Sequence, residues 1–199
     1  MAREPKNTWV LVAAIVFALL LSLGVVALDV IGTPVSGVLR VAALIGYQGV
    51  FLASLSSLYL IELTKYFGRR FVKVHHVVSV TALITLFLHG GLVAWQFGGV
   101  GVFLPTFRSL QSFLQFGGAP ALWLISVASL AALFRASLRK QWRQIHWLNY
   151  VAFLLGTIHA QLLGANFQHL VVRIFSGAMA AALVAIFVIK RVRRWRRRR

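Results

Sequence analysis

The chain has 199 residues, of which 60% are hydrophobic, with a mean hydropathy of +0.84 and a net charge of +18. Soluble domains are nearer half apolar, and three acidic side chains, Glu4, Asp29 and Glu62, are too few for a water-exposed surface of mixed charge, so we predict an integral membrane protein. The absence of cysteine excludes disulfides, thiolate metal ligands and cysteine-bound iron–sulfur clusters.

Six apolar runs are long enough to cross a bilayer, because a helical span needs about 20 residues. They lie at 8–28, 38–63, 72–95, 118–136, 143–163 and 169–189. The segment FLPTFRSLQSFLQF, residues 103–116, is too short and too polar to span. We expect it to be either a helix or loop in the outer interface or an ordinary ordered loop. The predicted fold class is an all-α bundle of six transmembrane helices, forming a single domain over residues 1–199 without an attached nucleotide-binding module.

The basic residues lie in patches that alternate along the chain. The connections after the second and fourth runs and the tail RVRRWRRRR are basic, whereas those near Asp29, around 96–117 and around 164–168 together carry only Arg108. Basic connections tend to stay on the cytoplasmic side, so both termini are predicted to be cytoplasmic in a multi-pass protein of the cytoplasmic or plasma membrane. We interpret the tail as a contact for anionic lipid and expect no nucleic-acid partner.

Five of the six histidines lie in two apolar segments, HHVVSVTALITLFLH (75–89) and HWLNYVAFLLGTIH (146–159). His75 and His89 are 14 positions apart, about 1400° on an ideal helix, which is within about 40° of four full turns. Their rings therefore share one helix face, about 21 Å apart along the axis. His76 is turned about 100° from His75 and is not expected to be a ligand.

The second histidine pair fits an ideal helix less well, since His146 and His159 are 13 positions apart. It needs local overwinding, a kink or unequal side-chain reach, which Gly156 and Thr157 could permit. The third and fifth spans run in the same direction, so His75 and His146 lie near the cytoplasmic face and His89 and His159 near the outer face. Each cross-helix pair can bind one flat ligand from both sides, and haem is the ligand that takes axial imidazoles in this way.

Other interpretations of these residues remain open. The histidines could be polar residues satisfied inside the bundle, whereas a zinc or copper site would need ligands within one coordination sphere. Arg40 and Arg173, inside the outer ends of the second and sixth spans, are candidate partners for haem propionates. His169 is either an interfacial residue or a contact for an acceptor. Glycines in the spans would admit a macrocycle or close helix packing equally well, and they are Gly46, Gly49, Gly90, Gly91 and Gly156.

The two histidine segments resemble the ferric reductase-like transmembrane domain family. The family's third span carries two histidines 14 apart, the first often followed by a basic residue, and His75, His76 and His89 match it. Its fifth span has an H-x-L-x-Y pattern and a second histidine 13 positions on, matched by His146, Leu148, Tyr150 and His159. Ser79 stands where a glycine is common in the family.

The resemblance implies a six-helix core with two b-type haems, as in ferric reductases, NADPH oxidases and the haem-binding membrane subunit of the bacterial methionine sulfoxide reductase system. In length the chain is nearest to that last subunit, although members of its subfamily commonly lack a histidine at the place of His75. The flavin and NAD(P)H domain of the oxidases is not present in the sequence.

We therefore predict a di-haem b-type cytochrome, an electron-transfer subunit of an oxidoreductase without catalytic side chains of its own. The donor would be a separate cytosolic flavin reductase or a membrane quinol, with flavin or quinone supplied by or shared with the partner. The acceptor on the outer side would be a partner protein, a ferric chelate or oxygen. A metal permease or membrane scaffold is the rival from another class, but a permeation path needs polar residues, and TALITLF and AFLLG between the histidines are dry.

Overall fold

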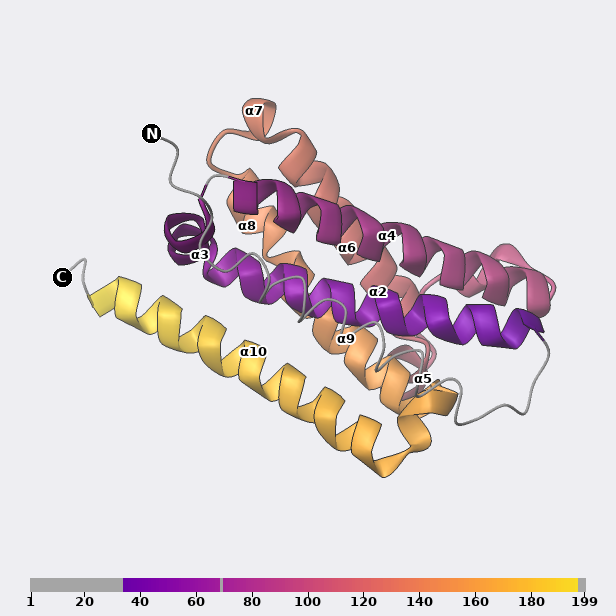
Figure 1. Ribbon diagram of the computed structural model, residues 1–199. Helices are drawn as coiled ribbons and strands as arrows, with labels where there is room; N and C mark the ends of the chain where they lie inside the picture. Colours follow the sequence, from indigo (N-terminus) through magenta and orange to yellow (C-terminus); the bar gives the residue numbers. More distant parts are fainter. Residues whose placement is uncertain (1–33, 69, 197–199) are drawn as a thin grey trace.

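The computed structural model describes residues 34–68 and 70–196, and within these ranges the chain is helical with short connections and contains no strand (Figure 1). The elements are α2 (Pro34–Leu58), α3 (Leu60–Phe67), α4 (Arg70–Gln96), η1 (Val100–Phe103), α5 (Leu110–Gln115), α6 (Gly118–Leu133), α7 (Arg135–Leu138), α8 (Trp142–His146), α9 (Leu148–Leu163), η2 (Ala165–Gln168) and α10 (Leu170–Arg196). The all-α fold class is confirmed. The first predicted span, 8–28, lies outside the described residues, so the count of six spans stays a prediction.

Among the described residues, three helices are long and apolar enough to cross a membrane. These stretches are Ser36–Leu58, Phe71–Gln96 and Leu170–Arg193, which correspond to the runs predicted at 38–63, 72–95 and 169–189. Helices α6 and α9 have 16 residues each, about 24 Å at 1.5 Å per residue, against a hydrocarbon core of about 30 Å. The runs predicted at 118–136 and 143–163 therefore contain shorter helices, each extended at one end by a separate short helix, α7 or α8.

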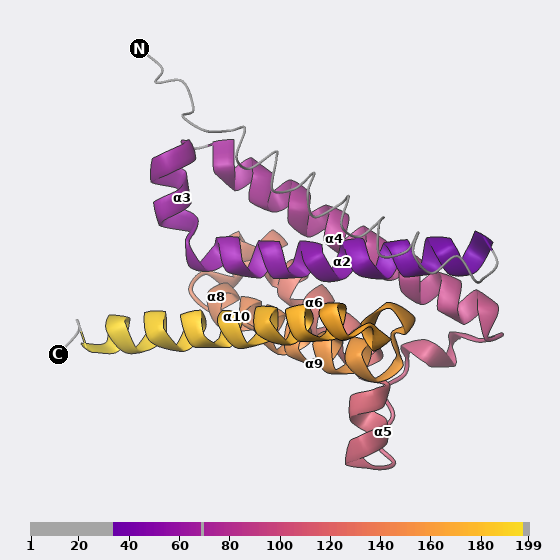
Figure 2. The same cartoon turned by 60° about the horizontal axis from the view of Figure 1, so that its bottom comes forward.

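The run predicted as one span at 38–63 is interrupted after Leu58, where α3 turns away from the axis of α2 (Figure 2). Lys190 of α10 holds this bend: its Nζ donates hydrogen bonds to the Leu58 carbonyl at 2.7 Å and to Glu62 Oε1 at 2.8 Å, and lies 3.7 Å from the Tyr59 ring centroid. A helix end leaves carbonyls without helical partners, so the ammonium satisfies one of them. The Lys190 hydrogen bond also holds the pKa of the exposed Glu62 carboxyl below its usual value.

Helix α2 packs against α4 on one side through small residues. A Cβ added at Gly49 would lie 2.7 Å from Ala82 Cβ, and one added at Gly46 would lie 2.7 Å from the Leu86 side chain. Such distances leave no room for a side chain, which is the usual reason for small residues where membrane helices approach closely. These two glycines therefore serve helix packing rather than the approach of a ligand.

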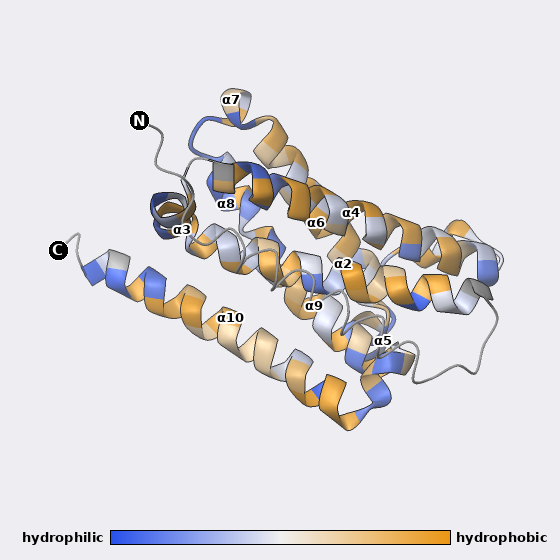
Figure 3. Ribbon diagram, viewed as in Figure 1, coloured by the Kyte–Doolittle hydropathy of each residue, from blue (hydrophilic) through white to orange (hydrophobic). Residues whose placement is uncertain are grey.

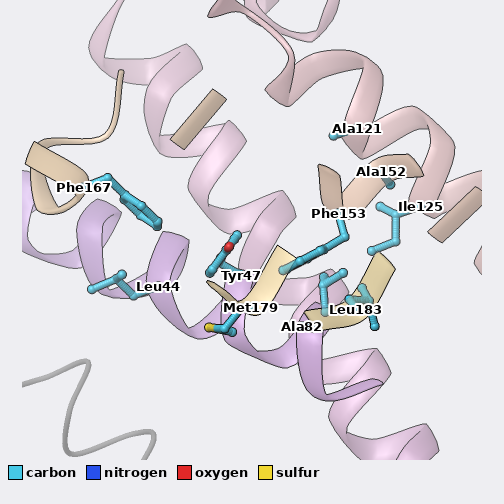
Figure 4. Close-up of a cluster of buried hydrophobic side chains, with 11 residues drawn as sticks. Leu44, Tyr47, Ala82, Ala121, Ile125, Ala152, Phe153, Phe167, Met179 and Leu183 are labelled. Carbon is cyan, nitrogen blue, oxygen red and sulfur yellow. The ribbon is translucent and has the colours of Figure 1, made fainter. Parts of the chain in front are cut away.

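Helix α2 packs against α9 on another side through aromatic rings (Figure 4). Tyr47 stacks on Phe153 with ring centroids 5.0 Å apart and meets Phe167 edge-on at 5.4 Å. The Tyr47 hydroxyl lies 3.1 Å from Thr157 Oγ1, so the one polar atom of this ring is satisfied across the same interface. Helix α10 contacts both α2 and α9 and contributes Met179 and Leu183 to the same core.

Hydrophilic residues gather at the two ends of the long helices, with a mainly apolar stretch between them (Figure 3). One end, here called the basic end, is formed by α3, α7, α8 and the last turns of α10, and carries Lys65, Arg135, Arg143 and Lys190. The other end, the far end, is formed by η1, α5 and η2. The connections that the charge pattern grouped on one side thus meet at one end of the fold.

The connection between α4 and α6 leaves the bundle at the far end, and α5 extends away from it across the direction of the long helices (Figure 2). Helix α5 starts at a capping box formed by Ser109 and Ser112, which confirms a helix within the segment 103–116. The segment and the residues just before it expose large apolar side chains: Trp95, Phe97, Val100, Leu104, Phe107, Leu110 and Phe116. Such a surface suits the interfacial layer of a bilayer, where aromatic rings are enriched.

We predict that this connection lies in the lipid interface, and the absence of native cysteine makes the test direct. Spin labels on Phe107→Cys and Leu110→Cys, at positions 78% and 74% exposed, should be relaxed more by lipid-soluble oxygen than by a water-soluble nickel chelate. A label on Lys140→Cys, at the basic end, is the aqueous control. Equal chelate access at Phe107, Leu110 and Lys140 would show that the connection is an ordinary solvated loop.

Candidate functional site

The four predicted ligand histidines lie on three helices, one of which carries two of them. His75 and His89 are on α4, His146 ends α8, and His159 is on α9. Helices α2 and α6 each contact both α4 and α9, so the two histidine-bearing segments are bridged on either side. His75 and His146 line one cavity. The structure thus brings the inner pair together, whereas the pairing of His89 with His159 stays a prediction.

Three of the four imidazoles bind a backbone carbonyl of a neighbouring element through Nδ1. His89 Nδ1 lies 3.2 Å from the Leu39 carbonyl of α2, His146 Nδ1 lies 3.0 Å from the Ala128 carbonyl of α6, and His159 Nδ1 lies 2.8 Å from the Gln115 carbonyl at the end of α5. A carbonyl only accepts hydrogen bonds, so Nδ1 carries the proton in each ring. Nε2 then keeps its lone pair, which is the arrangement typical of metal-bound histidine. At His146 this nitrogen lies 3.3 Å from Asn149 Nδ2, so a metal there would displace the amide.

The fourth imidazole, His75, binds a side chain instead. Its Nδ1 lies 2.9 Å from Ser56 Oγ of α2, and Ser56 Oγ donates its own hydrogen to the Ala53 carbonyl at 3.0 Å. Both bonds form together only if the His75 Nδ1–H is the donor to the hydroxyl. The Nε2 atom of His75 therefore also keeps its lone pair.

The contacts of these rings agree with the helix geometry expected for α4 and explain the spacing on α9. His75 and His89 both bind α2, so they share a face of α4. The 13-residue spacing spans a tightened turn at Trp147, where the Trp147 amide bonds the Gln144 carbonyl and the Tyr150 amide bonds the Trp147 carbonyl. These are three-residue steps, which overwind the helix. The distortion lies here and not at Gly156 and Thr157, which sit within the continuous helix α9.

Gly118, at the start of α6, makes room for the His159 ring. A Cβ added at Gly118 would lie 2.8 Å from His159 Nε2, 3.0 Å from Cδ2 and 3.2 Å from Cε1. An atom in line with the Nε2 lone pair would lie clearly farther from the two ring carbons than from the nitrogen. The glycine therefore faces the flat side of the ring and leaves the in-plane lone pair clear.

The two predicted propionate partners lie in different surroundings. Arg40, next to Leu39, donates two hydrogen bonds from its guanidinium to the side-chain oxygen of the buried Asn166 in η2, the Nε bond measuring 2.8 Å. It therefore stays close to the residue that holds His89. Arg173 has its side chain exposed on α10. His169 is exposed just before α10, and the exposed His76 ring lies 5.9 Å from the His75 ring without sharing its contact to Ser56.

A polar layer that sequence reasoning missed surrounds the inner pair. Ser54, Ser57, Ser79, Ser129 and Asn149 line the same cavity as His75 and His146. Ser57 Oγ also lies 2.8 Å from the Tyr150 hydroxyl, which joins α2 to α9. The signal available in the sequence was the cluster SLSSL within an otherwise apolar run.

The donor set fits haem chemically, whereas the space is tight. Asn149 Oδ1 is buried beside the inner pair without a hydrogen-bond partner, and a Cβ added at Gly156 would meet nothing within 4 Å. The inner cavity measures about 30 Å³, room for about one water, so a macrocycle there requires the surrounding helices to move apart. Over residues 34–68 and 70–196 no three His, Cys, Asp or Glu side chains converge on one point, and an iron with two axial imidazoles needs only two.

No protein-family model, curated protein or solved structure matches the chain. The resemblance to the ferric reductase-like family therefore rests on the histidine motifs and their spacing.

Proposed function

We propose that this protein is a di-haem b-type membrane cytochrome, the electron-transfer subunit of a membrane oxidoreductase. The observation that carries the proposal is the set of four histidines on α4, α8 and α9, each hydrogen-bonded through Nδ1 to α2, α5 or α6. An imidazole held in this way offers Nε2 to a metal and cannot turn freely. Two such pairs at two depths suit two haems, one between His75 and His146 and the other between His89 and His159.

The chain's own residues would orient the ligands and exclude water. The carbonyls of Leu39, Ala128 and Gln115 fix three rings and, by accepting from Nδ1–H, raise the basicity of Nε2. Arg40, near His89, is the better placed of the two arginines to pair with a carboxylate at the far end. When bound, haem would supply the one-electron chemistry, for which the protein sets position and potential.

The core between the two histidine layers favours electron transfer over the rival function of a metal permease. Leu44, Val50, Ala82 and Phe153 are buried there, and the polar atom of Tyr47 is taken by Thr157. Ions crossing a membrane need polar or charged groups along their path, whereas electrons can cross a dry core between two redox centres. The apolar filling therefore supports the cytochrome.

We propose a six-span topology with residues 8–28 as the first span and both termini cytoplasmic, since basic connections face that side. The donor would then meet the basic end, either as a cytosolic flavin reductase or as a membrane quinol, with flavin or quinone supplied by or shared with the partner. The acceptor would be a partner protein, a ferric chelate or oxygen at the far end. A haem-binding subunit of a methionine sulfoxide reductase-type system is a narrower form of the same proposal.

The test of this function is the haem content of the purified protein. Expression with sufficient haem should give two b-type haems per chain by pyridine haemochrome assay, and low-temperature EPR should show two low-spin ferric species, because each haem would be held by two of the four imidazoles. Protein that remains colourless after expression and reconstitution with haem would refute the function.

Single alanine substitutions of His75 and His76 should show which of these adjacent histidines is the haem ligand. His75→Ala removes the ring held by Ser56 and should leave about one haem per chain, whereas His76→Ala removes a ring outside that contact and should leave two. Each variant is the control for the other, because the positions are adjacent and the substitution is the same. Loss of haem from His76→Ala alone would mean that His76, and not His75, is the ligand on α4.

Gly118→Ala tests the outer pair from the neighbouring helix. The added Cβ would press on the face of the His159 ring and should turn Nε2 out of line, weakening haem at this pair. Gly91→Ala is the matched control, since its Cβ would meet no chain atom within 4 Å. We expect the EPR signal of one low-spin haem to change or disappear in Gly118→Ala, and unchanged spectra would show that the ring does not depend on this contact.

A further inference from the structure

The four histidines differ in the group that their Nδ1 atoms bind. His89, His146 and His159 bind backbone carbonyls, which no substitution removes. His146 has the Asn149 amide nitrogen nearby as well, whereas His75 is the one ring of the four whose Nδ1 binds no carbonyl and instead binds the hydroxyl of Ser56. The Ser56 hydroxyl therefore holds the His75 ring, and a single substitution at Ser56 removes this hydrogen bond.

The hydroxyl contact is more than the common serine bond within a helix. Serines in helices often bond a carbonyl of the preceding turn, and both Ser56 and Ser57 do so, to Ala53 and Ser54. Each of them also reaches a second helix: Ser56 Oγ lies 2.9 Å from His75 Nδ1, and Ser57 Oγ lies 2.8 Å from the Tyr150 hydroxyl. The two serines thus share a helix, a local bond and an interhelical bond, and differ in the ring that they meet.

A hydrogen bond accepted from Nδ1–H affects the other nitrogen of the ring. It fixes the plane of the imidazole and raises the basicity of Nε2, and a stronger axial donor favours the more highly charged, oxidised iron. Hydrogen bonding around the axial ligands is one of the means by which a protein sets a haem potential. Because Ser56 Oγ gives its proton to the Ala53 carbonyl, its oxygen is polarised towards accepting from His75.

We propose that Ser56 is a positioning residue that sets the orientation and donor strength of His75 and thereby lowers the reduction potential of the inner haem relative to a site without this hydrogen bond. This inference rests on the proposed function. It concerns the inner haem only, because the outer histidines donate their Nδ1 hydrogen bonds to the carbonyls of Leu39 and Gln115.

The experiment is a redox titration of the purified, haem-loaded protein followed by its visible spectrum. In Ser56→Ala one of the two midpoint potentials should move to a more positive value while the other stays at its wild-type value, and the EPR g-values of one low-spin species should change. Ser56→Thr keeps a hydroxyl and should restore the wild-type midpoint. Ser126→Ala, which loses an equivalent serine–carbonyl bond within α6, to Leu122, and lies outside the lining of the inner cavity, is the control and should leave the midpoints near wild type.

The outcomes separate this inference from the function on which it rests. Wild-type protein without haem would overturn the function itself. Wild-type protein with two haems whose midpoints are unaltered in Ser56→Ala, or are moved equally by Ser126→Ala, would overturn the role of Ser56 alone. Loss of one haem from Ser56→Ala, with two retained in Ser56→Thr and Ser126→Ala, would support the positioning role, whereas loss from Ser56→Thr as well would contradict it.

Discussion

The hydrogen bond from each histidine Nδ1 to a neighbouring element is the interaction on which the arrangement depends. In a bundle filled mainly by apolar side chains, an imidazole without a partner costs about 1–3 kcal/mol for each unsatisfied group. The four rings avoid this cost by reaching α2, α5 or α6 rather than their own helices. The bonds that satisfy these polar groups also tie the helices together and fix the tautomer that leaves Nε2 for a ligand.

Helix α2 is where these bonds meet the packing of the core. Its first turns supply the Leu39 carbonyl to His89 and its last turns supply Ser56 to His75. Between them, Gly49 admits α4 on one side and Tyr47 packs on α9 on the other. The spacing of the two α4 histidines is therefore matched by the spacing of their two partners on α2, and a shift of either helix along its axis would break both bonds.

The apolar runs and the shared face of His75 and His89 could be predicted from the sequence, because each depends on residues within a single helix. The bend after Leu58 was not, because the lysine that satisfies it, Lys190, lies 132 residues away. Nor could residue spacing locate the overwound turn at Trp147, since ideal helix geometry gives every residue the same rotation. Gly118 was missed for a similar reason: its role depends on which ring lies opposite, and this is a tertiary fact.

The surroundings of the inner histidine pair are more polar than those of the outer pair. Hydroxyl and amide groups surround the inner pair next to the basic end, among them Ser57, Ser129 and the unpartnered oxygen of Asn149. At the outer pair, both Nδ1 atoms bind backbone carbonyls, and Gly118 lies flat against one ring. Haem potentials respond to hydrogen bonding and to the polarity of the surroundings. The two haems proposed for these pairs would therefore have unequal potentials, and unequal potentials would favour electron transfer along the bundle in one direction.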